Sequence, residues 1–207
     1  MKLTLLLLAL CPVVYAADAP GWETASSEVA RMAVPKGWRS LDGIKRTMPV
    51  YRQGDGMGVS AVDETGEPLQ IGLTLERFPA DDVPTETIAK ELAKGASKNP
   101  RLQMVGKEVV EAVKLSDQTE ATLVTNEFIK EGSRRSLQMK LIAKDASGQI
   151  WIVSGFLVGG KESQWPAPKS KLGVWLRAHL VSLTLTGKEV DGKGLEEAYR
   201  AVMEGGK

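Results

Sequence analysis

The most regular feature of the chain is an alternation of apolar and polar residues, which is typical of strands that bury one face of a sheet. Residues 69–75 show it clearly, because Leu or Ile stands at every second position and polar or small residues stand between them. Turn-forming residues cluster between such runs. The pattern predicts strands at residues 32–34, 48–52, 57–62, 69–75, 103–113, 119–129, 136–144 and 149–158.

One of these runs does not alternate. Residues 150–158 are apolar at nearly every position. A strand of this kind buries both of its faces, so we expect it to be central in its sheet, with helices on both sides. Trp151 lies within this strand and is interpreted as a structural anchor, since a buried tryptophan covers about 150–250 Å².

Three segments repeat apolar residues with the spacing of an amphipathic helix. The first begins near Pro84, the second follows a loop at residues 159–171 and ends by Gly187, and the third is a short helix in the tail. Their apolar stripes are Ile88, Leu92 and Ala96 with Ala89 and Ala93 beside them; Leu172, Trp175, Leu176, His179, Leu180 and Leu183; and Leu195, Tyr199 and Val202.

Residues 34–37 have the sequence Val-Pro-Lys-Gly, which fits a type I turn. Proline presets φ at the second position of such a turn, and glycine suits the fourth. We expect this turn to direct Trp38 into the core as a structural anchor, together with Trp151 and Trp175. The alternative is an exposed Trp38 that stacks on a ligand.

The first residues have the features of a signal peptide. Lys2 precedes an apolar run that is too short to span a bilayer, and Ala16 suits the position before a signal-peptidase cut. The sequence predicts a signal peptide at residues 1–16, a lead-in segment at 17–30, a single α+β domain at 31–187 and a C-terminal tail with a short helix at 188–207.

Cys11 is the only cysteine, and it raises the alternative of a lipoprotein anchor. Leu10 stands before it, where that processing site requires a small residue, so cleavage after Ala16 is favoured. The exported chain then has no cysteine and forms neither a disulfide nor a thiolate metal site.

The charge balance bears on the class of partner. The chain has 27 basic and 26 acidic side chains, a net charge of +1, and no charged block. This pattern argues against binding to nucleic acid or to an anionic membrane surface. No transmembrane segment is expected, because the only long apolar run is the signal peptide.

Residues that carry chemistry are few. His179, the only histidine, lies in an apolar helical stripe, so we interpret it as a core or rim residue with one hydrogen bond rather than a catalytic or metal-binding one. Asp81 and Asp82 fit the start of a helix better than a calcium loop. A pair of catalytic carboxylates stays open, because acids are plentiful and none stands out. The sequence therefore predicts no catalytic residue, no cofactor and no metal site.

One cluster of residues remains as a candidate ligand or partner surface. Lys161, Trp165, Lys169 and Lys171 gather in a long loop before a helix N-terminus, which favours anions. The alternative is that the lysines are solvated and that Trp165 packs on the start of the helix.

The order of these elements resembles the PsbP-like superfamily, which includes the DcrB-like periplasmic proteins. The segments that carry the resemblance are "VPKGW" at residues 34–38 and "KLGVWLRAHLVSLTL" at residues 171–185. The resemblance covers roughly residues 30–186. It implies an α/β/α sandwich with a central, mainly antiparallel sheet, and a non-enzymatic role in assisting or binding other proteins. It transfers no catalytic residue.

We therefore expect an exported, soluble, non-enzymatic protein of the periplasm or cell envelope that acts on a protein partner. Two alternatives remain. One is a binder of a small anionic or lipidic ligand, and the other is a hydrolase of uncharacterised substrate.

Overall fold

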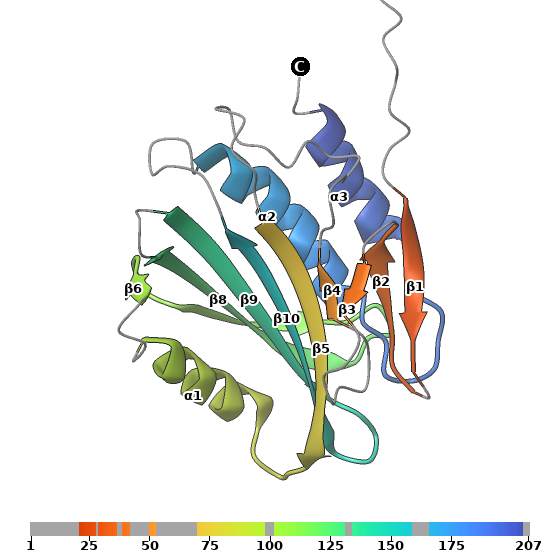
Figure 1. Cartoon of the computed structure of the whole chain (residues 1–207). Helices are drawn as coiled ribbons and strands as arrows, with labels where there is room; N and C mark the ends of the chain where they lie inside the picture. The colour runs from red at the N-terminus through yellow and green to blue at the C-terminus, as the bar shows by residue number, and fades with distance from the viewer. Residues whose placement is uncertain are drawn as a thin grey trace, which may run out of the picture.

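The structure is a computed structural model that describes residues 21–27, 29–36, 39–41, 50–52, 70–97, 102–130, 134–158 and 166–204. The predicted signal peptide, Trp38 and the strand expected at residues 57–62 lie outside the described residues. Within those ranges the chain forms a large sheet, a small two-stranded sheet and three helices (Figure 1).

The large sheet is antiparallel at every described pairing. Its strand order is β3-β4-β5-β10-β9-β8-β6, and β7 also pairs with β8, next to β6. The strands are β3 (Arg39–Leu41), β4 (Val50–Arg52), β5 (Gln70–Ala80), β6 (Leu102–Met104), β7 (Val109–Lys114), β8 (Glu120–Lys130), β9 (Arg134–Lys144) and β10 (Gln149–Val158).

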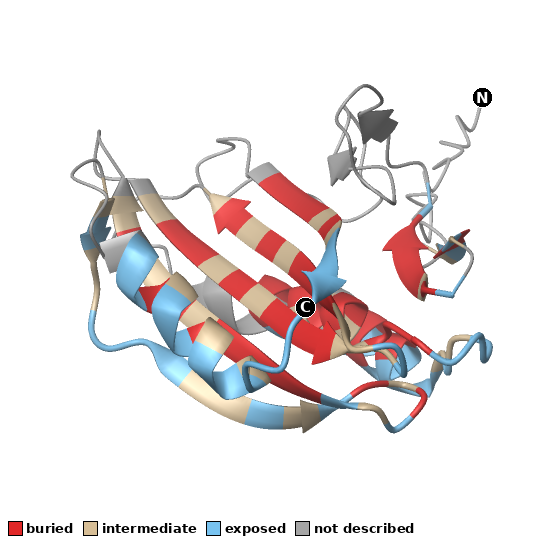
Figure 2. Cartoon of the chain, turned by 90° about the horizontal axis from the view of Figure 1, so that it is seen from below, coloured by how far each residue is buried: buried red, intermediate tan, exposed pale blue. Residues whose placement is uncertain are grey.

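The position of β10 confirms the interpretation of the non-alternating run. β10 lies between β5 and β9 and is buried on both faces. Trp151 and Val153 belong to the core on one face of the sheet, and Ile150 and Ile152 belong to a smaller cluster on the other face. Figure 2 shows how buried positions run along the strands of the sheet.

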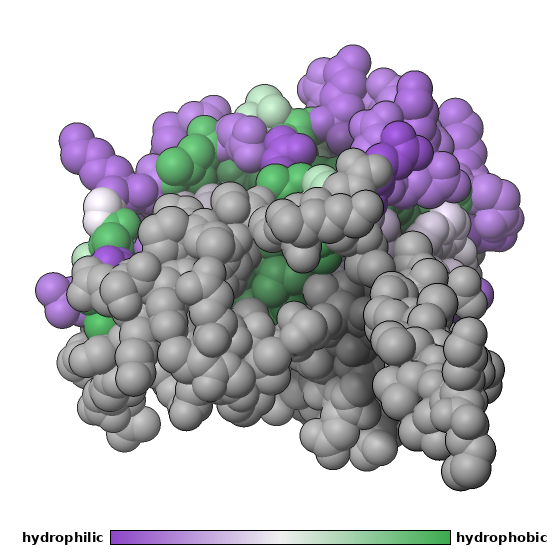
Figure 3. Space-filling view, turned by 90° about the horizontal axis from the view of Figure 1, so that it is seen from above, coloured by the Kyte–Doolittle hydropathy of each residue, from purple (hydrophilic) through white to green (hydrophobic). Residues whose placement is uncertain are grey.

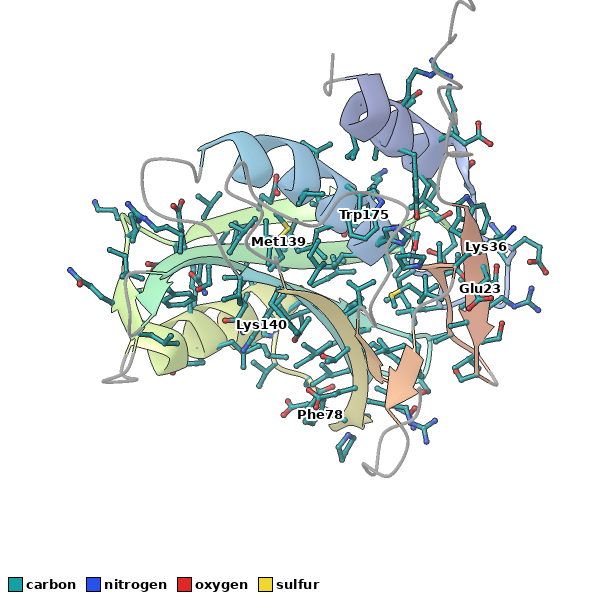
Figure 4. All side chains as sticks on the ribbon, turned by 45° about the horizontal axis from the view of Figure 1, so that its top comes forward. Glu23, Lys36, Phe78, Met139, Lys140 and Trp175 are labelled. Carbon is teal, nitrogen blue, oxygen red and sulfur yellow. The ribbon has the colours of Figure 1, made fainter. Side chains whose placement is uncertain are left out.

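Helices cover both faces, as predicted. α1 (Thr85–Ser97) packs on one face, whereas α2 (Pro166–Val181) packs on the other with α3 (Lys193–Glu204) beside it (Figure 1). The α+β class and the α/β/α arrangement around an antiparallel sheet are therefore confirmed. Figure 4 shows the two faces at neighbouring residues, since Met139 lies on the α2 side of β9 and Lys140 on the opposite side.

Glycines let α2 approach the sheet closely. A Cβ atom on Gly155 of β10 would lie 2.8 Å from Leu180 and 2.9 Å from Leu176, both on α2. A Cβ on Gly173 of α2 would lie 3.2 Å from Leu137 of β9. Because glycine has no side chain at these two contact points, α2 lies closer to the sheet than larger residues would allow.

The small sheet joins the two ends of the fold. It pairs β1 (Trp22–Ser26) with β2 (Arg31–Pro35), so the segment predicted as a lead-in contains a strand. Arg31 and Thr184 exchange two backbone hydrogen bonds, of 3.0 and 2.8 Å, which attach β2 to the chain beyond α2. The ring of Trp22 packs where a side chain on Gly192 would otherwise stand.

Several element boundaries differ from the sequence prediction. The strand expected at residues 103–113 is two strands, because Gly106 has a φ of 76° that interrupts the extended chain between β6 and β7. β5 continues to Ala80, past the last alternating apolar residue. β3 was not predicted at all. Pro35 is the last residue of β2 and Lys36 is in a turn, whereas Gly37 lies outside the described residues, so the type I turn at residues 34–37 stays a prediction.

The prediction for α2 is wrong at both ends. The helix begins at Pro166, inside the segment expected as a loop, because a proline in the first turn lacks only an N–H that the helix does not use. It ends at Val181, six positions before the predicted stop at Gly187, whose φ of 72° belongs to the following connection. Leu183 and Leu185 are buried in that connection rather than in a helix.

The inward face of α1 is also shifted. Ala89 and Ala93 are fully buried, whereas Ile88 and Leu92 are only half-buried. The small residues thus form the centre of the contact with the sheet, and the larger ones flank it. In the ranges that the structure describes, no helix has the length and apolar character needed to cross a membrane.

Candidate functional site

A groove lies between α2, α3 and the turn that joins β7 to β8. Its volume is about 400 Å³, within the range of about 300–1,000 Å³ that is usual for ligand sites. Figure 3 views the molecule from above and shows hydrophobic surface between hydrophilic side chains. The groove is lined by Lys114, Leu115, Ser116, Gln118, Val174, Arg177, Ala178, Val181, Ser182, Asp191, Gly194, Leu195, Glu197 and Ala198.

The apolar floor of the groove follows from helical spacing. Val174, Ala178 and Val181 recur at the spacing of one face of α2, and Leu195 and Ala198 stand on the facing side of α3. Leu195 and Ala198 are buried, whereas Val174 is 53% exposed at the mouth. The small Ala178 and Ala198 leave the space between the helices open.

Charges of both signs stand along the groove. Lys114 ends β7, and Arg177 on α2 forms an ion pair with Glu111 of β7 over 3.3 Å. Asp191 and Glu197 stand on the side of α3. The α2–β7 side is therefore basic and the α3 side acidic, with apolar residues between them.

The turn from Leu115 to Thr119 contributes Leu115, Ser116 and Gln118 to the lining of the groove. The Leu115 N–H donates to the Thr119 carbonyl, and the Gln118 N–H donates to the Leu115 carbonyl, each over 2.9 Å. The Ser116 N–H donates to the carbonyl of Val181 at the end of α2, and the Asp191 N–H donates to Ser116 Oγ. The turn is thus fixed to both helical sides of the groove.

A buried carboxylate holds the same turn against the chain after α2. Asp117 accepts hydrogen bonds from the Thr119 and Leu185 N–H groups and from both the N–H and the hydroxyl of Thr186. Burial alone raises the pKa of Asp117, but the hydrogen bonds from Thr119, Leu185 and Thr186 outweigh it and lower the pKa below its usual value.

The only histidine, His179, belongs to a buried network that includes Ser182 of the groove lining. His179 is fully buried, with Nδ1 2.8 Å from the Ala33 carbonyl oxygen and Nε2 3.0 Å from the Tyr199 hydroxyl. A carbonyl only accepts, so Nδ1 carries the proton, and Nε2 accepts from Tyr199. Ser182 extends the network, because its Oγ accepts from the Ala33 N–H and donates to the His179 carbonyl.

Burial keeps this network neutral. It lowers the pKa of His179 to about 4, although the hydrogen bond to Ala33 acts in the opposite direction. It also raises the pKa of Tyr199 to about 12, opposed by a hydrogen bond with Trp175. The rings of Trp175 and His179 meet edge to face at a centroid distance of 4.7 Å. His179 is therefore a core residue with two hydrogen bonds, where the sequence predicted one.

The side chains of the sequence-predicted candidate surface all lie outside the part of the chain that the structure describes. Lys161 and Trp165 lie outside the described residues. Lys169 and Lys171 belong to α2 itself rather than to a loop before it, and their side chains are not described. The candidate surface therefore stays a prediction, although the loop expected at residues 159–171 ends earlier, because α2 begins at Pro166.

The predicted anchors are described in two of three cases. Trp151 and Trp175 are almost completely buried, and Trp38 lies outside the described residues. Nε1 of Trp151 donates to Asp145 over 2.9 Å, which satisfies its polar atom. Trp175 points from α2 toward the sheet (Figure 4).

Metal-ligating residues do not gather in the described part of the chain, where no group of three or more His, Cys, Asp or Glu side chains is placed to hold an ion. Asp81 accepts a hydrogen bond from the Val83 N–H over 2.8 Å, just before α1. It therefore organises the entry to the helix, as the sequence predicted.

The groove was missed by sequence reasoning because its parts are distant in the chain. Alanines such as Ala178 and Ala198 are common in helices and indicate no site. Gln118 lies in a turn, but glutamine is not a typical turn residue, so the sequence does not predict a turn at this position. The one available signal was the apolar stripe of the tail helix, which indicated that Leu195 and Tyr199 face another element.

Comparisons with known proteins find structures that are similar to this chain. No family model matches the chain, and no curated protein matches its sequence. LpqN of Mycobacterium tuberculosis, described as involved in cell envelope biogenesis, is 14% identical, with a TM-score of 0.47 over 80% of this chain and 91% of that one. Cyanobacterial PsbP (CyanoP) from Synechocystis is 15% identical, with a TM-score of 0.47 over 86% of this chain and 98% of that one.

The Ran-binding protein Mog1p of Saccharomyces cerevisiae is also similar. It is 11% identical, with a TM-score of 0.44 over 89% of this chain and 93% of that one. A PsbP structure, from the superfamily that the sequence resembles, is thus among the structures similar to this chain.

Proposed function

We propose that this protein is an exported, non-enzymatic binding protein of the periplasm or cell envelope, and that it holds a protein partner in the groove between α2 and α3. In this proposal the chain is exported through residues 1–16 and the mature form begins at Ala17. The observation that carries the proposal is the groove itself, with an apolar floor between sides of opposite charge.

The composition of the groove supports binding to a protein. Interfaces combine an apolar centre with a polar rim, and here Leu195 and Ala198 form the floor while Lys114 and Glu197 stand at the edges. Charges of both signs suit a partner segment that carries both signs as well.

The state of His179 supports the non-enzymatic part of the proposal. A general base must reach the proton that it removes. Both ring nitrogens of His179 are engaged with Ala33 and Tyr199 inside the core, and the pKa of about 4 leaves the ring neutral at pH 7.

Partner capture with a blocked groove tests the proposal. Gly194 lines the groove, and a Cβ atom there would meet nothing within 4 Å, so Gly194→Trp fills the groove without a clash at its own position. Gly95 on α1 is equally open and lies on the other side of the sheet, which makes Gly95→Trp the matched control.

We expect a benzophenone side chain at Val174 to crosslink a discrete envelope protein in the wild-type and Gly95→Trp backgrounds, and to lose that product with Gly194→Trp. Equal crosslinking in all three backgrounds would place the partner elsewhere. In parallel, turnover of esterase, phosphatase, glycosidase or peptidase substrates that a single Asp or Glu substitution abolishes would make the protein a hydrolase.

A small anionic or lipidic ligand is the second candidate, because the groove volume of about 400 Å³ suits a small molecule. Native mass spectrometry distinguishes a small ligand from a protein partner. A ligand that co-purifies with wild type and is absent from Gly194→Trp would favour the small-ligand candidate. The same instrument gives the intact mass, which tests whether the exported chain begins at Ala17 without an acyl chain.

A further inference from the structure

Gln118 has a backbone conformation that is unusual for its residue type. Its φ is 71°, and among the residues that the structure describes it is the only one other than glycine with a positive φ. This left-handed conformation brings Cβ close to the following carbonyl oxygen and is costly for any residue with a side chain. Glycine adopts it freely, and short hairpin loops usually have glycine or asparagine there.

The turn itself does not require the glutamine side chain. Two hydrogen bonds within it join backbone groups of Leu115, Gln118 and Thr119, and a third joins the Thr119 N–H to the Asp117 side chain, so none of them uses the side chain of Gln118. No hydrogen bond of the Gln118 amide to any other described residue is present. The chain therefore places a strained residue where glycine would fit, and strain of this kind is concentrated at functional positions.

The position of Gln118 suits its side chain to hydrogen bonding with an occupant of the groove. Gln118 lines the groove, as do Lys114 and Ser116. A glutamine side chain carries one carbonyl acceptor and one NH₂ donor, which match the N–H and C=O of a peptide group. An extended peptide presents such groups along its length, whereas a helix has already used them.

The charges on the two sides of the groove favour one orientation of an occupant. Among the lining residues that the structure describes, Arg177 is paired with Glu111, which leaves Lys114 as the cation that acts on an occupant from the basic side. Glu197 stands on the acidic side, and Asp191 already accepts from the Lys193 N–H at the start of α3. An occupant with one acidic and one basic flank meets complementary charge in only one orientation.

We propose that the groove binds a short extended peptide segment of a partner protein. An apolar side chain lies over Ala178 and Ala198, an acidic flank lies beside Lys114, a basic flank lies beside Glu197, and the Gln118 amide pairs with a main-chain peptide group. This proposal rests on the proposed function and adds the chemistry of the recognised segment.

Selection from a phage-displayed library of random heptapeptides on the full exported chain tests the proposal. We expect an enriched sequence with an apolar centre between an acidic and a basic residue in a fixed order. The charge-exchanged protein, Lys114→Glu with Glu197→Lys, should enrich the reverse order. The same order from both proteins, or no preference for charge, would overturn the proposal.

Gln118 is tested by two substitutions that keep the turn. Gln118→Gly removes the amide and relieves the backbone, so we expect the enriched peptide to bind roughly tenfold more weakly while the protein becomes more resistant to urea. Gln118→Asn keeps an amide in a residue that tolerates this φ and should bind more tightly than Gln118→Gly. Unchanged binding in Gln118→Gly would show that the side chain has no part in recognition.

Failure of this inference is distinguishable from failure of the proposed function. Peptides that compete with one another, and that Gly194→Trp excludes, but that show no dependence on charge or on Gln118 overturn only the inference. If no peptide is enriched, the extended-peptide model is wrong, and crosslinking from Val174 still decides whether a folded partner uses the groove.

Discussion

The hydroxyl of Tyr199 on α3 donates a hydrogen bond to Nε2 of His179 on α2 over 3.0 Å, and both residues are buried. The second ring nitrogen is held by the Ala33 carbonyl, so one imidazole connects the N-terminal hairpin, α2 and α3. The groove between the two helices depends on this connection, because it fixes α3 at a set distance from α2.

Tyr199→Phe tests the connection. The substitution keeps the ring but leaves Nε2 of His179 buried without a donor, which costs about 1–3 kcal/mol. We expect the free energy of unfolding in urea to fall by that amount. Glu196→Gln, on the exposed side of the same helix, should change it by less than about 0.5 kcal/mol. Equal effects of the two substitutions would contradict the role of the hydroxyl.

The depressed pKa of His179 predicts a pH dependence of stability. The unfolded histidine takes up a proton near pH 6.5, whereas the folded one does so only near pH 4. The stabilisation is therefore fully present above about pH 6.5 and is lost as the pH falls toward 4, by about 3 kcal/mol in total.

The measurement is urea unfolding of wild type and His179→Gln between pH 4 and 7. Carboxylates contribute to the slope in both proteins, so the difference between the two slopes isolates the histidine. We expect wild type to lose stability more steeply than the variant as the pH falls. Parallel slopes would mean that His179 is accessible to protons in the folded state.

Glycine substitutions should act in opposite directions on the two faces of the sheet. Gly155→Ala introduces a methyl group within 3.0 Å of Leu176 and Leu180, so we expect a loss of about 1–3 kcal/mol. Gly95→Ala places the same group in open space on α1 and should raise stability by up to about 1 kcal/mol. Thermal melts that shift in the same direction would contradict the close approach of α2.

Asp117→Asn tests the attachment of the turn. Oδ2 of Asp117 accepts from the Leu185 N–H over 2.6 Å and from two groups of Thr186. Oδ1 accepts from the Thr119 N–H. An amide has one oxygen, so either the Thr119 N–H or the Leu185 and Thr186 groups face its NH₂ and lose their acceptor, and the oxygen that remains carries no charge. We expect a loss of about 1.5–3 kcal/mol, as for hydrogen bonds to a charged group.

Hydrogen exchange gives the local readout of this substitution, since the Leu185 and Thr186 amides should exchange faster in Asp117→Asn. The control is Asp82→Asn, at an exposed position before α1, which should leave both amides protected. Unchanged exchange at Leu185 in the Asp117 variant would show that the carboxylate does not hold the segment.

Much of the fold was predictable from local pattern. The run at residues 150–158 is apolar on both faces because β10 is covered by helices on both sides, and the alternation in residues 69–75 matches a strand whose Leu73 and Leu75 are buried. Patterns of this kind report burial directly, so they locate central strands well. They end where burial ends, which is why the largely exposed end of β5, from Glu76 to Ala80, was missed.

The candidate site was not predictable in the same way. It depends on where α3 docks and on a φ of 71° at Gln118, and neither leaves a periodic signal in the sequence. The sequence instead drew attention to lysines before α2, because a lysine-rich loop is visible in a linear pattern. Long-range docking brings together Lys114, Arg177 and Glu197, which lie in three separate segments.

The attachment of β2 to the chain around α2 sets the order in which the molecule is completed. Ala33 receives its partners from Ser182 and His179, which lie 149 and 146 residues further along the sequence. A chain that emerges from a ribosome or a translocation channel N-terminus first therefore holds β2 without these partners until most of it has emerged. Closing so large a loop is slow. We therefore expect the final step of folding to be the docking of the β1–β2 hairpin onto α2 and α3.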